Sequence, residues 1–214
     1  MPGFRLSEGL VERLREHILA GAAAPGRPLR QDALAAELGV SKIPLREAMA
    51  RLEQDGLLRS EANRGYFVRP LSAAEAAEVY ELRLALEPET AARAAAQADE
   101  GERQAARERL ERLDKVMLEH GDGVGMANRA FHLALLRPAR RPVTFEILER
   151  LHVLSERYVR KHLEPLGRDE RASAEHHDLF EAWSARDGET VAFRMRAHIA
   201  QTLADLRRQL PTER

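Results

Sequence analysis

The sequence predicts a mostly α-helical protein with two domains: an N-terminal domain of three helices and a β-hairpin, and a C-terminal all-helical bundle. Three observations lead to this expectation. Helix-forming residues abound, and only 5% of the 214 residues are aromatic. Apolar residues recur at helical spacing along most of the chain. Strand-like patterns occur only near residues 57–69. We place the domain boundary after Pro70, which gives domains 1–70 and 71–214.

Composition excludes several classes of protein. Cysteine is absent, so no disulfide framework or thiol chemistry is expected. No apolar run approaches the roughly 20 residues of a membrane span, and the N-terminus lacks the apolar core of a signal peptide. We therefore expect a cytoplasmic protein without a membrane partner. The net charge is −1, so any affinity for nucleic acid must come from a local patch and from dimerisation.

The first domain has the pattern of a winged helix-turn-helix. Its predicted elements are helices at residues 7–20, 30–38 and 42–55 and strands at residues 57–59 and 66–69. Gly39 ends the second helix, because glycine tolerates a positive φ there, and Ser41 is a suitable N-cap for the third. Three helices followed by a hairpin, or wing, form this DNA-binding fold.

The third helix has the properties of a recognition helix, which enters the major groove and meets the base edges. Lys42 and Arg46 share one basic face. Arg46 is suited to a forked contact with guanine, whereas Ser41 and Lys42 are suited to phosphates. In the wing, Arg64 could enter a minor groove and Gly65 allows close backbone approach. The alternative is an ordinary helical hairpin with a solvated charged face, covered by a β-hairpin that acts as a lid.

Residues 10–70 resemble the N-terminal domain of the GntR family of bacterial transcription regulators. The resemblance is carried by the stretches AGAAAPGRPL, LAAELGVSKIPLREAMARLEQDGL and NRGYFV. It implies that five residues lie at the DNA, with Arg46 as the base reader: Arg30, Ser41, Lys42, Arg46 and Gly65. Two positions depart from the family pattern. Lys42 stands where Arg is frequent, and Asp32 stands where the fatty-acid-responsive branch has a DNA-contacting Arg, so the operator should differ.

The second domain shows only helical patterns. Ser72 and Glu75 have the spacing of a capping box that opens a long helix, in which Pro88 should produce a kink. Polar residues 99–101 end it. The remaining predicted helices are a charged one that ends near His120 and four near residues 126–136, 142–163, 169–186 and 188–210.

Three histidines of this domain lie on apolar, inward helical faces. They are His132, His176 and His198, and Asn128 lies one turn before His132 on the same face. A helical bundle can gather such groups around one divalent transition metal, for which Zn, Ni, Fe and Mn are candidates. The alternative is three core histidines that are satisfied separately. Among the others, His152 is expected to be exposed, while the surroundings of His162 leave its position open.

Residues 72–210 resemble the all-helical effector domain, called FCD, of the FadR subgroup. The matching stretches are VYELRLALEPETAARAA, NRAFHLAL, EHHDLFEAWSARDGE and MRAHI. In metal-binding members of that subgroup, one Asp and three His hold the ion. The resemblance places the histidines at His132, His176 and His198 and puts Asn128 at the Asp position, which removes a negative charge. It also implies a small carboxylate effector near the metal.

Arg83 resembles an inward Arg of the subgroup, which makes it a candidate effector-binding residue. A guanidinium can pair with a carboxylate in a bidentate way. The alternative is an Arg that is tied to Glu87, four residues further along the same helix.

These inferences favour a DNA-binding transcription regulator rather than an enzyme. A homodimer would bind a pseudo-palindromic double-stranded DNA operator, and a small organic acid would change that binding. Because most members of the family are repressors released by an effector, the resemblance implies repression. One alternative is a regulator that responds to the metal ion itself. A less favoured one is a metal-dependent hydrolase, which His177 and Asp178 would suit.

Overall fold

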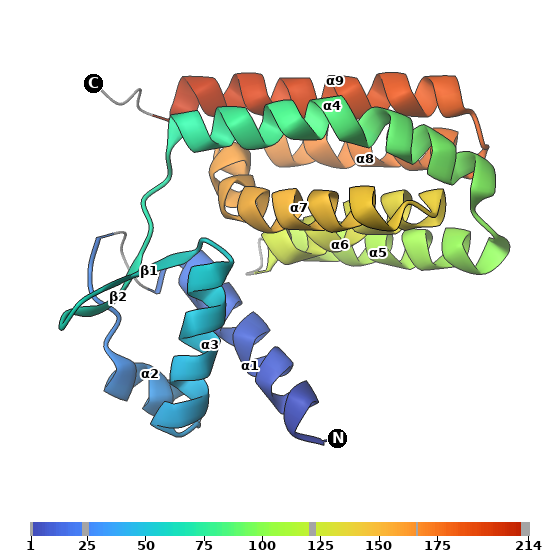
Figure 1. The fold of residues 1–214 in the computed structure, drawn as a ribbon. Coiled ribbons are helices and arrows are strands. Elements are labelled where there is room, and N and C mark those ends of the chain that lie inside the picture. The colour runs from blue at the N-terminus through green and yellow to red at the C-terminus, as the bar shows by residue number, and fades with distance from the viewer. Residues whose placement is uncertain (1, 23–25, 120–122, 166, 211–214) are drawn as a thin grey trace. The chain divides into compact units, whose positions relative to one another are not determined.

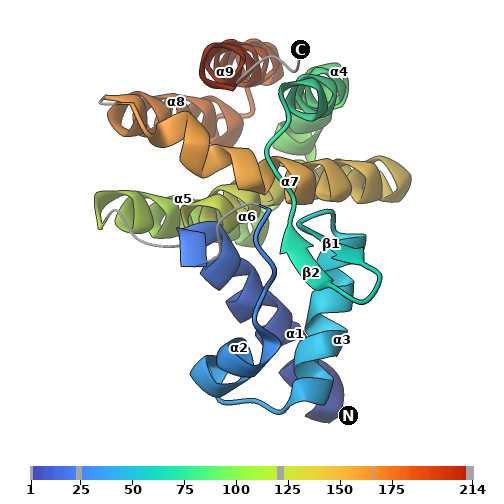
Figure 2. The same ribbon diagram turned by 90° about the vertical axis from the view of Figure 1, so that its left-hand side faces the viewer.

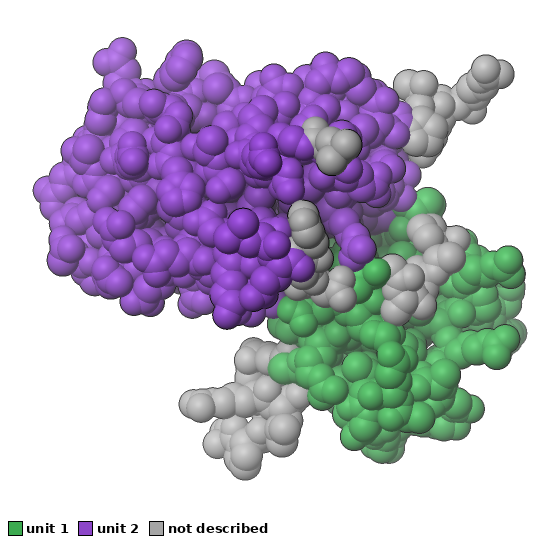
Figure 3. All heavy atoms as spheres, turned by 180° about the vertical axis from the view of Figure 1, so that it is seen from behind, with its two compact units in different colours: residues 1–70 green, residues 71–214 purple. Residues whose placement is uncertain are grey.

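The computed structural model describes residues 2–22, 26–119, 123–165 and 167–210 (Figure 1). The chain divides into two compact units, Met1–Pro70 and Leu71–Arg214 (Figure 3). No helix within the described ranges is long and apolar enough to cross a membrane.

The first unit is a winged helix-turn-helix, as the sequence predicts. Its elements are α1 (Pro2–His17), a π-helical turn (Ile18–Ala22), α2 (Gln31–Leu38), α3 (Lys42–Gln54), β1 (Leu58–Glu61) and β2 (Gly65–Val68). The two strands pair antiparallel, from Leu58 opposite Val68 to Glu61 opposite Gly65. Helix α1 begins five residues earlier than predicted, so Ser7 lies inside it rather than at its N-cap.

The helix-turn-helix is held by apolar side chains on α1 and α3. Leu14 of α1 and Leu45, Met49 and Leu52 of α3 are all fully buried. Gly39 ends α2 with a φ of 66°, a conformation that favours glycine. Ser41 occupies the N-cap of α3 as predicted, but its side chain makes no capping hydrogen bond to a described residue.

The second unit is an all-helical bundle, also as predicted. Its elements are α4 (Ala73–Gln97), α5 (Glu100–Leu118), α6 (Val124–Leu136), a 3₁₀ turn (Arg137–Ala139), α7 (Pro142–Leu163), α8 (Arg168–Ser184) and α9 (Gly188–Gln209). Helix α4 packs along α9, while α6 packs between α5 and α7 (Figures 1 and 2). The predicted boundaries of the last four helices agree with the structure to within two residues.

Helix starts in this unit follow local chemistry. The Ser72 hydroxyl accepts a hydrogen bond from Glu75 N at 3.3 Å and so caps α4. A full capping box occurs instead at α5, where the Asp99 and Glu102 side chains each accept from the other's backbone N–H. Pro142 stands at the first turn of α7, where its missing N–H has little cost.

A close approach of α6 and α7 positions the centre of the bundle. A Cβ atom on Gly125 would lie 2.8 Å from Glu156 Cγ and 2.9 Å from Glu156 O, so only glycine fits here without a shift of the backbone. The contact brings His132, two turns further along α6, against the middle of α7. Buried polar side chains gather there.

Candidate functional site

The first candidate surface lies on α3 and is basic at its N-terminal end. Lys42, Ile43 and Arg46 are exposed, whereas Leu45 and Met49 on the opposite side are fully buried. Ile43 is 72% exposed, which is unusual for a large apolar side chain. Because α3 packs through its opposite, apolar side, these three side chains remain accessible to a DNA groove.

Lys42 has an acidic neighbour on α2. Its Nζ lies 2.7 Å from Asp32 Oδ1, and both side chains are exposed. Since no ion pair of Arg46 is found within the described residues, Arg46 is the basic group on this face that remains available for a new partner.

The wing carries the other predicted DNA contacts. Arg64 is exposed at its tip, pairs with Glu61 and lies 5.2 Å above the Phe67 ring. Gly65 follows with a φ of 91°, and a Cβ atom there would meet no described atom within 4 Å. Arg30 is exposed at the N-cap of α2. The predicted residues thus lie on the helix-turn-helix and on the wing of one unit.

The second candidate site is formed by three histidines from three helices. His132 on α6, His176 on α8 and His198 on α9 each offer one nitrogen within 4.8 Å of a nitrogen from the other two. Their ring centroids are 4.7–5.3 Å apart. The structure therefore brings together the three histidines that the sequence selects from separate stretches of the chain.

Two of these rings lack the partners that buried polar groups normally have. None of the four ring nitrogens of His132 and His176 has a hydrogen-bond partner among the described residues, and both side chains are at most 2% exposed. Burial, with the nearby His198, holds the pKa of both imidazoles well below its usual value, so they are neutral. Neutral, unpartnered imidazole nitrogens are suitable ligands for a divalent transition metal.

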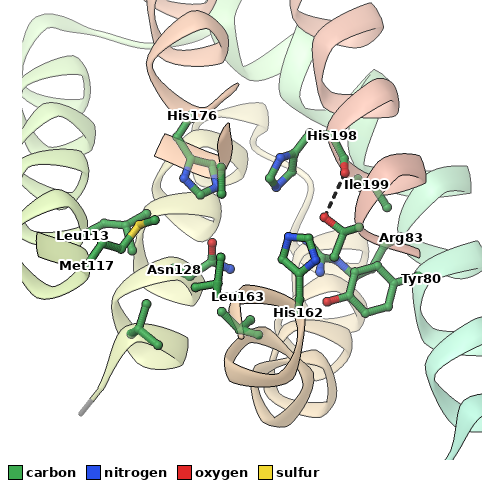
Figure 4. A pocket seen from close by; sticks show the side chains of 14 residues that line it. Tyr80, Arg83, Leu113, Met117, Asn128, His162, Leu163, His176, His198 and Ile199 are labelled. Carbon is green, nitrogen blue, oxygen red and sulfur yellow. Dashed lines mark hydrogen bonds between the residues drawn. The ribbon is translucent and has the colours of Figure 1, made fainter. Parts of the chain in front are cut away.

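A small cavity adjoins two of these histidines, His176 and His198 (Figure 4). His176, His198, Asn128, Arg83 and His162 line it together with apolar side chains from α5, α6, α7 and α9. The Asn128 amide points into it, so its oxygen could act as a further ligand. The centre of a water molecule can move within about 20 Å³ of this cavity, which is room for a metal-bound water and little more.

Arg83 adopts the alternative arrangement, in which Glu87 holds it. Arg83 Nε lies 2.5 Å from Glu87 Oε1, and Nη2 lies 3.4 Å from Oε2. Nη1 donates to Ser155 Oγ at 3.2 Å. The pair is almost wholly buried. Burial raises the pKa of Glu87, but the charge of Arg83 and then that of His152 lower it, and together they bring the pKa of Glu87 to about 2. A carboxylate effector would have to share this guanidinium with Glu87.

The expectation that His152 is exposed is wrong. It is 1% exposed, and its Nε2 lies 3.1 Å from Glu87 Oε1. Its polar neighbours Ser155 and Glu156, a type of residue that usually indicates a solvated face, are buried as well. Ser155 accepts a hydrogen bond from Arg83, and Glu156 pairs with Arg129. The polar side of α7 thus faces the polar side chains of α4 and α6.

His152, Glu87 and His132 form a second group with the spacing of metal ligands. However, the Glu87 charge is already balanced by Arg83, whose guanidinium would repel a cation bound so close to it. We therefore attribute this group to a structural network and the first group to a candidate metal centre.

Of the other histidines described in this unit, His162 lies on the edge of this centre and His177 lies at the surface. His162 is 5% exposed and lines the cavity, and burial, then the nearby His198, lowers its pKa to about 4. His177 is exposed and contacts Asp114. His120 lies outside the described residues. The sequence leaves the position of His162 open, because its apolar neighbours Tyr158 and Val159 indicate burial without indicating what the ring contacts.

The first unit is a winged helix-turn-helix that presents a basic recognition helix. The second is a helical unit with a buried cavity lined by candidate metal-binding side chains. This combination defines the class of one-component transcription regulators. Comparison with known proteins gives the family. Residues 6–68 match the model of bacterial regulatory proteins of the gntR family, and residues 78–201 match the FCD domain. The chain belongs to the GntR family of regulators with an FCD domain.

Relatives and solved structures agree with this assignment. The HTH-type transcriptional repressor RspR of Escherichia coli is 27% identical, over 97% of this chain and 91% of its own. The HTH-type regulator BphR of Paraburkholderia xenovorans is 30% identical, over 94% of this chain and 85% of its own. The structure of E. coli McbR/YncC superimposes with a TM-score of 0.76 at 26% identity, covering 95% of this chain and 98% of that one. This protein is a DNA-binding transcription regulator and not an enzyme, which removes the hydrolase alternative.

Proposed function

We propose that this protein is a homodimeric repressor whose operator binding is controlled by a small carboxylate bound beside a divalent metal ion. The observation that supports the ion is the set of buried nitrogens of His132 and His176, which have no hydrogen-bond partner in the described parts of the chain and lie beside His198. His132, His176, His198 and the Asn128 oxygen would hold it. When bound, the ion would supply Lewis-acid coordination for a ligand carboxylate.

The residues of this chain provide the rest of the pocket. Arg83 keeps its guanidinium at the cavity wall, where it could contact a carboxylate alongside Glu87. Leu113, Met117 and Ile199 give the cavity an apolar side, which suits a short hydrocarbon segment. Because the cavity is small, such a ligand requires these side chains to move apart. An effector with unequal affinity for the closed and opened states would shift their populations.

At the DNA, we propose that Arg46 reads a base and that Arg30, Ser41 and Lys42 contact phosphates. Arg64 and Gly65 would place the wing against a neighbouring groove. The dimer would then read two half-sites of a pseudo-palindrome.

A direct experiment joins the two halves of the proposal. Metal content of the purified protein is measured first, and one ion per chain is expected. An operator is then selected from random DNA, and its release is measured with a panel of hydroxy-, keto- and dicarboxylic acids. The proposal is supported if one of the acids releases the operator and does so only when the protein is loaded with metal. It is contradicted if release depends on neither the acid nor the metal.

A second candidate is a regulator that responds to the ion alone. The small volume of the cavity favours it, because a metal-bound water fits there without the opening that an organic acid would need. Operator binding that changes with metal, and with no acid of the panel, would identify this case.

A further inference from the structure

We infer that Glu175 is a positioning residue of the candidate metal centre, where it holds the His198 ring so that Nε2 is the nitrogen that binds the ion. The inference rests on the metal centre proposed above and adds a residue that contacts no ion itself. Its basis is a contact between two helices. His198 Nδ1 on α9 lies 2.7 Å from Glu175 Oε2 on α8.

The chemistry of this contact determines where the ring proton lies. An ionised carboxylate only accepts hydrogen bonds, so Nδ1 must carry the proton that His198 donates. A neutral imidazole has one such proton, which leaves the lone pair on Nε2 available. A metal binds the nitrogen without the proton. Glu175 therefore selects the tautomer in which His198 is a ligand through Nε2.

The Glu175 carboxylate is itself held in place. Its other oxygen, Oε1, lies 3.2 Å from Arg171 Nε, one turn earlier on α8. Arg171 also pairs with Asp205, one of the fully buried residues of α9. Helix α8 thus contributes His176 as a ligand and, from the preceding position, the group that orients the ligand on α9.

Charge makes this residue important in this chain. None of the candidate ligands, His132, His176, His198 and Asn128, is negative. The nearby Glu87 is balanced by Arg83 at 2.5 Å. Among the described residues, Glu175 is the carboxylate that is hydrogen-bonded to a candidate ligand. It also contacts Arg171, but that arginine is shared with Asp205, so the Glu175 charge would still offset part of the charge of the ion through the imidazole ring.

The test measures Zn²⁺ affinity of the full-length protein by competition with a chromophoric chelator. Glu175→Gln keeps the shape of the side chain but removes its charge, and we expect it to weaken Zn²⁺ binding about 10- to 100-fold. The visible spectrum of the Co²⁺-loaded variant should change as well. The matched control is Asp114→Asn, which alters a carboxylate 2.8 Å from the exposed His177 Nε2 and should leave the affinity unchanged.

Three outcomes would overturn the inference. If Glu175→Gln binds Zn²⁺ as tightly as the parent, the positioning role is wrong while the metal centre stands. If the parent binds no Zn²⁺, the metal centre is wrong and this role is wrong with it. A ¹⁵N spectrum of the metal-free parent provides a test that does not depend on a variant folding. It should show His198 protonated at Nδ1, and a proton at Nε2 instead would contradict the inference.

Discussion

Lys42 Nζ, at the start of the recognition helix, lies 2.7 Å from Asp32 Oδ1 on the preceding helix. The lysine is therefore partly neutralised within its own unit, before any DNA is bound. We expect Asp32→Asn to raise operator affinity about two- to fivefold, since exposed ion pairs contribute roughly 0.2–1 kcal/mol. Fluorescence anisotropy at several salt concentrations measures this change. Glu37→Gln alters another exposed carboxylate of α2 and serves as the control; equal effects of the two variants would contradict a specific role for Asp32.

Arg46 should determine sequence specificity. Replacement by Ala removes a forked contact with a base, which costs about 1–3 kcal/mol on the operator and much less on random DNA. Arg51→Ala, at the exposed C-terminal end of the same helix, is the control and should change both affinities little. Footprints of the two variants on the selected operator decide the question, and an intact Arg46→Ala footprint would refute the base-reading role.

Loss of a histidine ligand should remove the stabilisation that metal provides. In the parent, saturating Zn²⁺ at about 100 times its Kd would stabilise the fold by roughly 2.7 kcal/mol and raise Tm by roughly 5–10 °C. The rise should vanish in His176→Ala and in His198→Ala, each compared with and without a chelator. His177→Ala replaces an exposed neighbour of His176, and this variant should keep the rise in Tm on metal binding. A parent Tm that chelation does not alter would show that the site holds no metal.

Arg83→Lys separates charge from geometry in the proposed effector pocket. The lysine keeps a positive charge beside Glu87 but loses the planar fork that matches a carboxylate. We expect about tenfold more acid to be needed for half-release of the operator, with DNA affinity unchanged in the absence of acid. Titration of the DNA complex with the active acid gives this value. An unaltered midpoint would place the effector away from Arg83.

The Arg83–Glu87 pair should make stability fall in acid. The pKa of Glu87 is lowered to about 2 in the folded protein, below the ordinary 4.5. The unfolded chain therefore binds the proton first, so the stabilisation is complete above pH 4.5 and is lost as pH falls toward 2. Urea denaturation between pH 2.5 and 6 measures it.

The Glu87→Gln variant is the comparison for this pH dependence. At neutral pH it should be less stable by about 3–5 kcal/mol, because Arg83 would remain buried without its counter-charge. Its stability should also vary less with pH over the same range. A variant with the stability and pH profile of the parent would contradict this account of the pair.

The sequence predicts helices well where local chemistry marks their ends. Pro142 and the residues before Pro165 define α7 almost to the residue, and Gly39 defines the turn of the first unit. It also predicts that His132, His176 and His198 face inward, because each has apolar neighbours at helical spacing. These inferences depend on contacts within one turn of one helix.

Contacts between helices are where sequence reasoning fails. His152 has polar neighbours, which usually indicate a solvated face, yet those neighbours are buried against Arg83 and Arg129. Glu175 contacts His198 from another helix, 23 residues away, and no spacing rule relates the two. The sequence shows which residues are polar, but only the packing of the bundle shows which polar residues share a buried network.

The small cavity beside His176 has a kinetic consequence. Because little more than a water molecule fits, an organic acid can enter only those molecules whose walls have moved apart. Its observed association rate would then stop rising at high concentration, where the frequency of opening becomes the limit. The delay between the arrival of an effector and the response would be set by the folded protein and not by the supply of the effector.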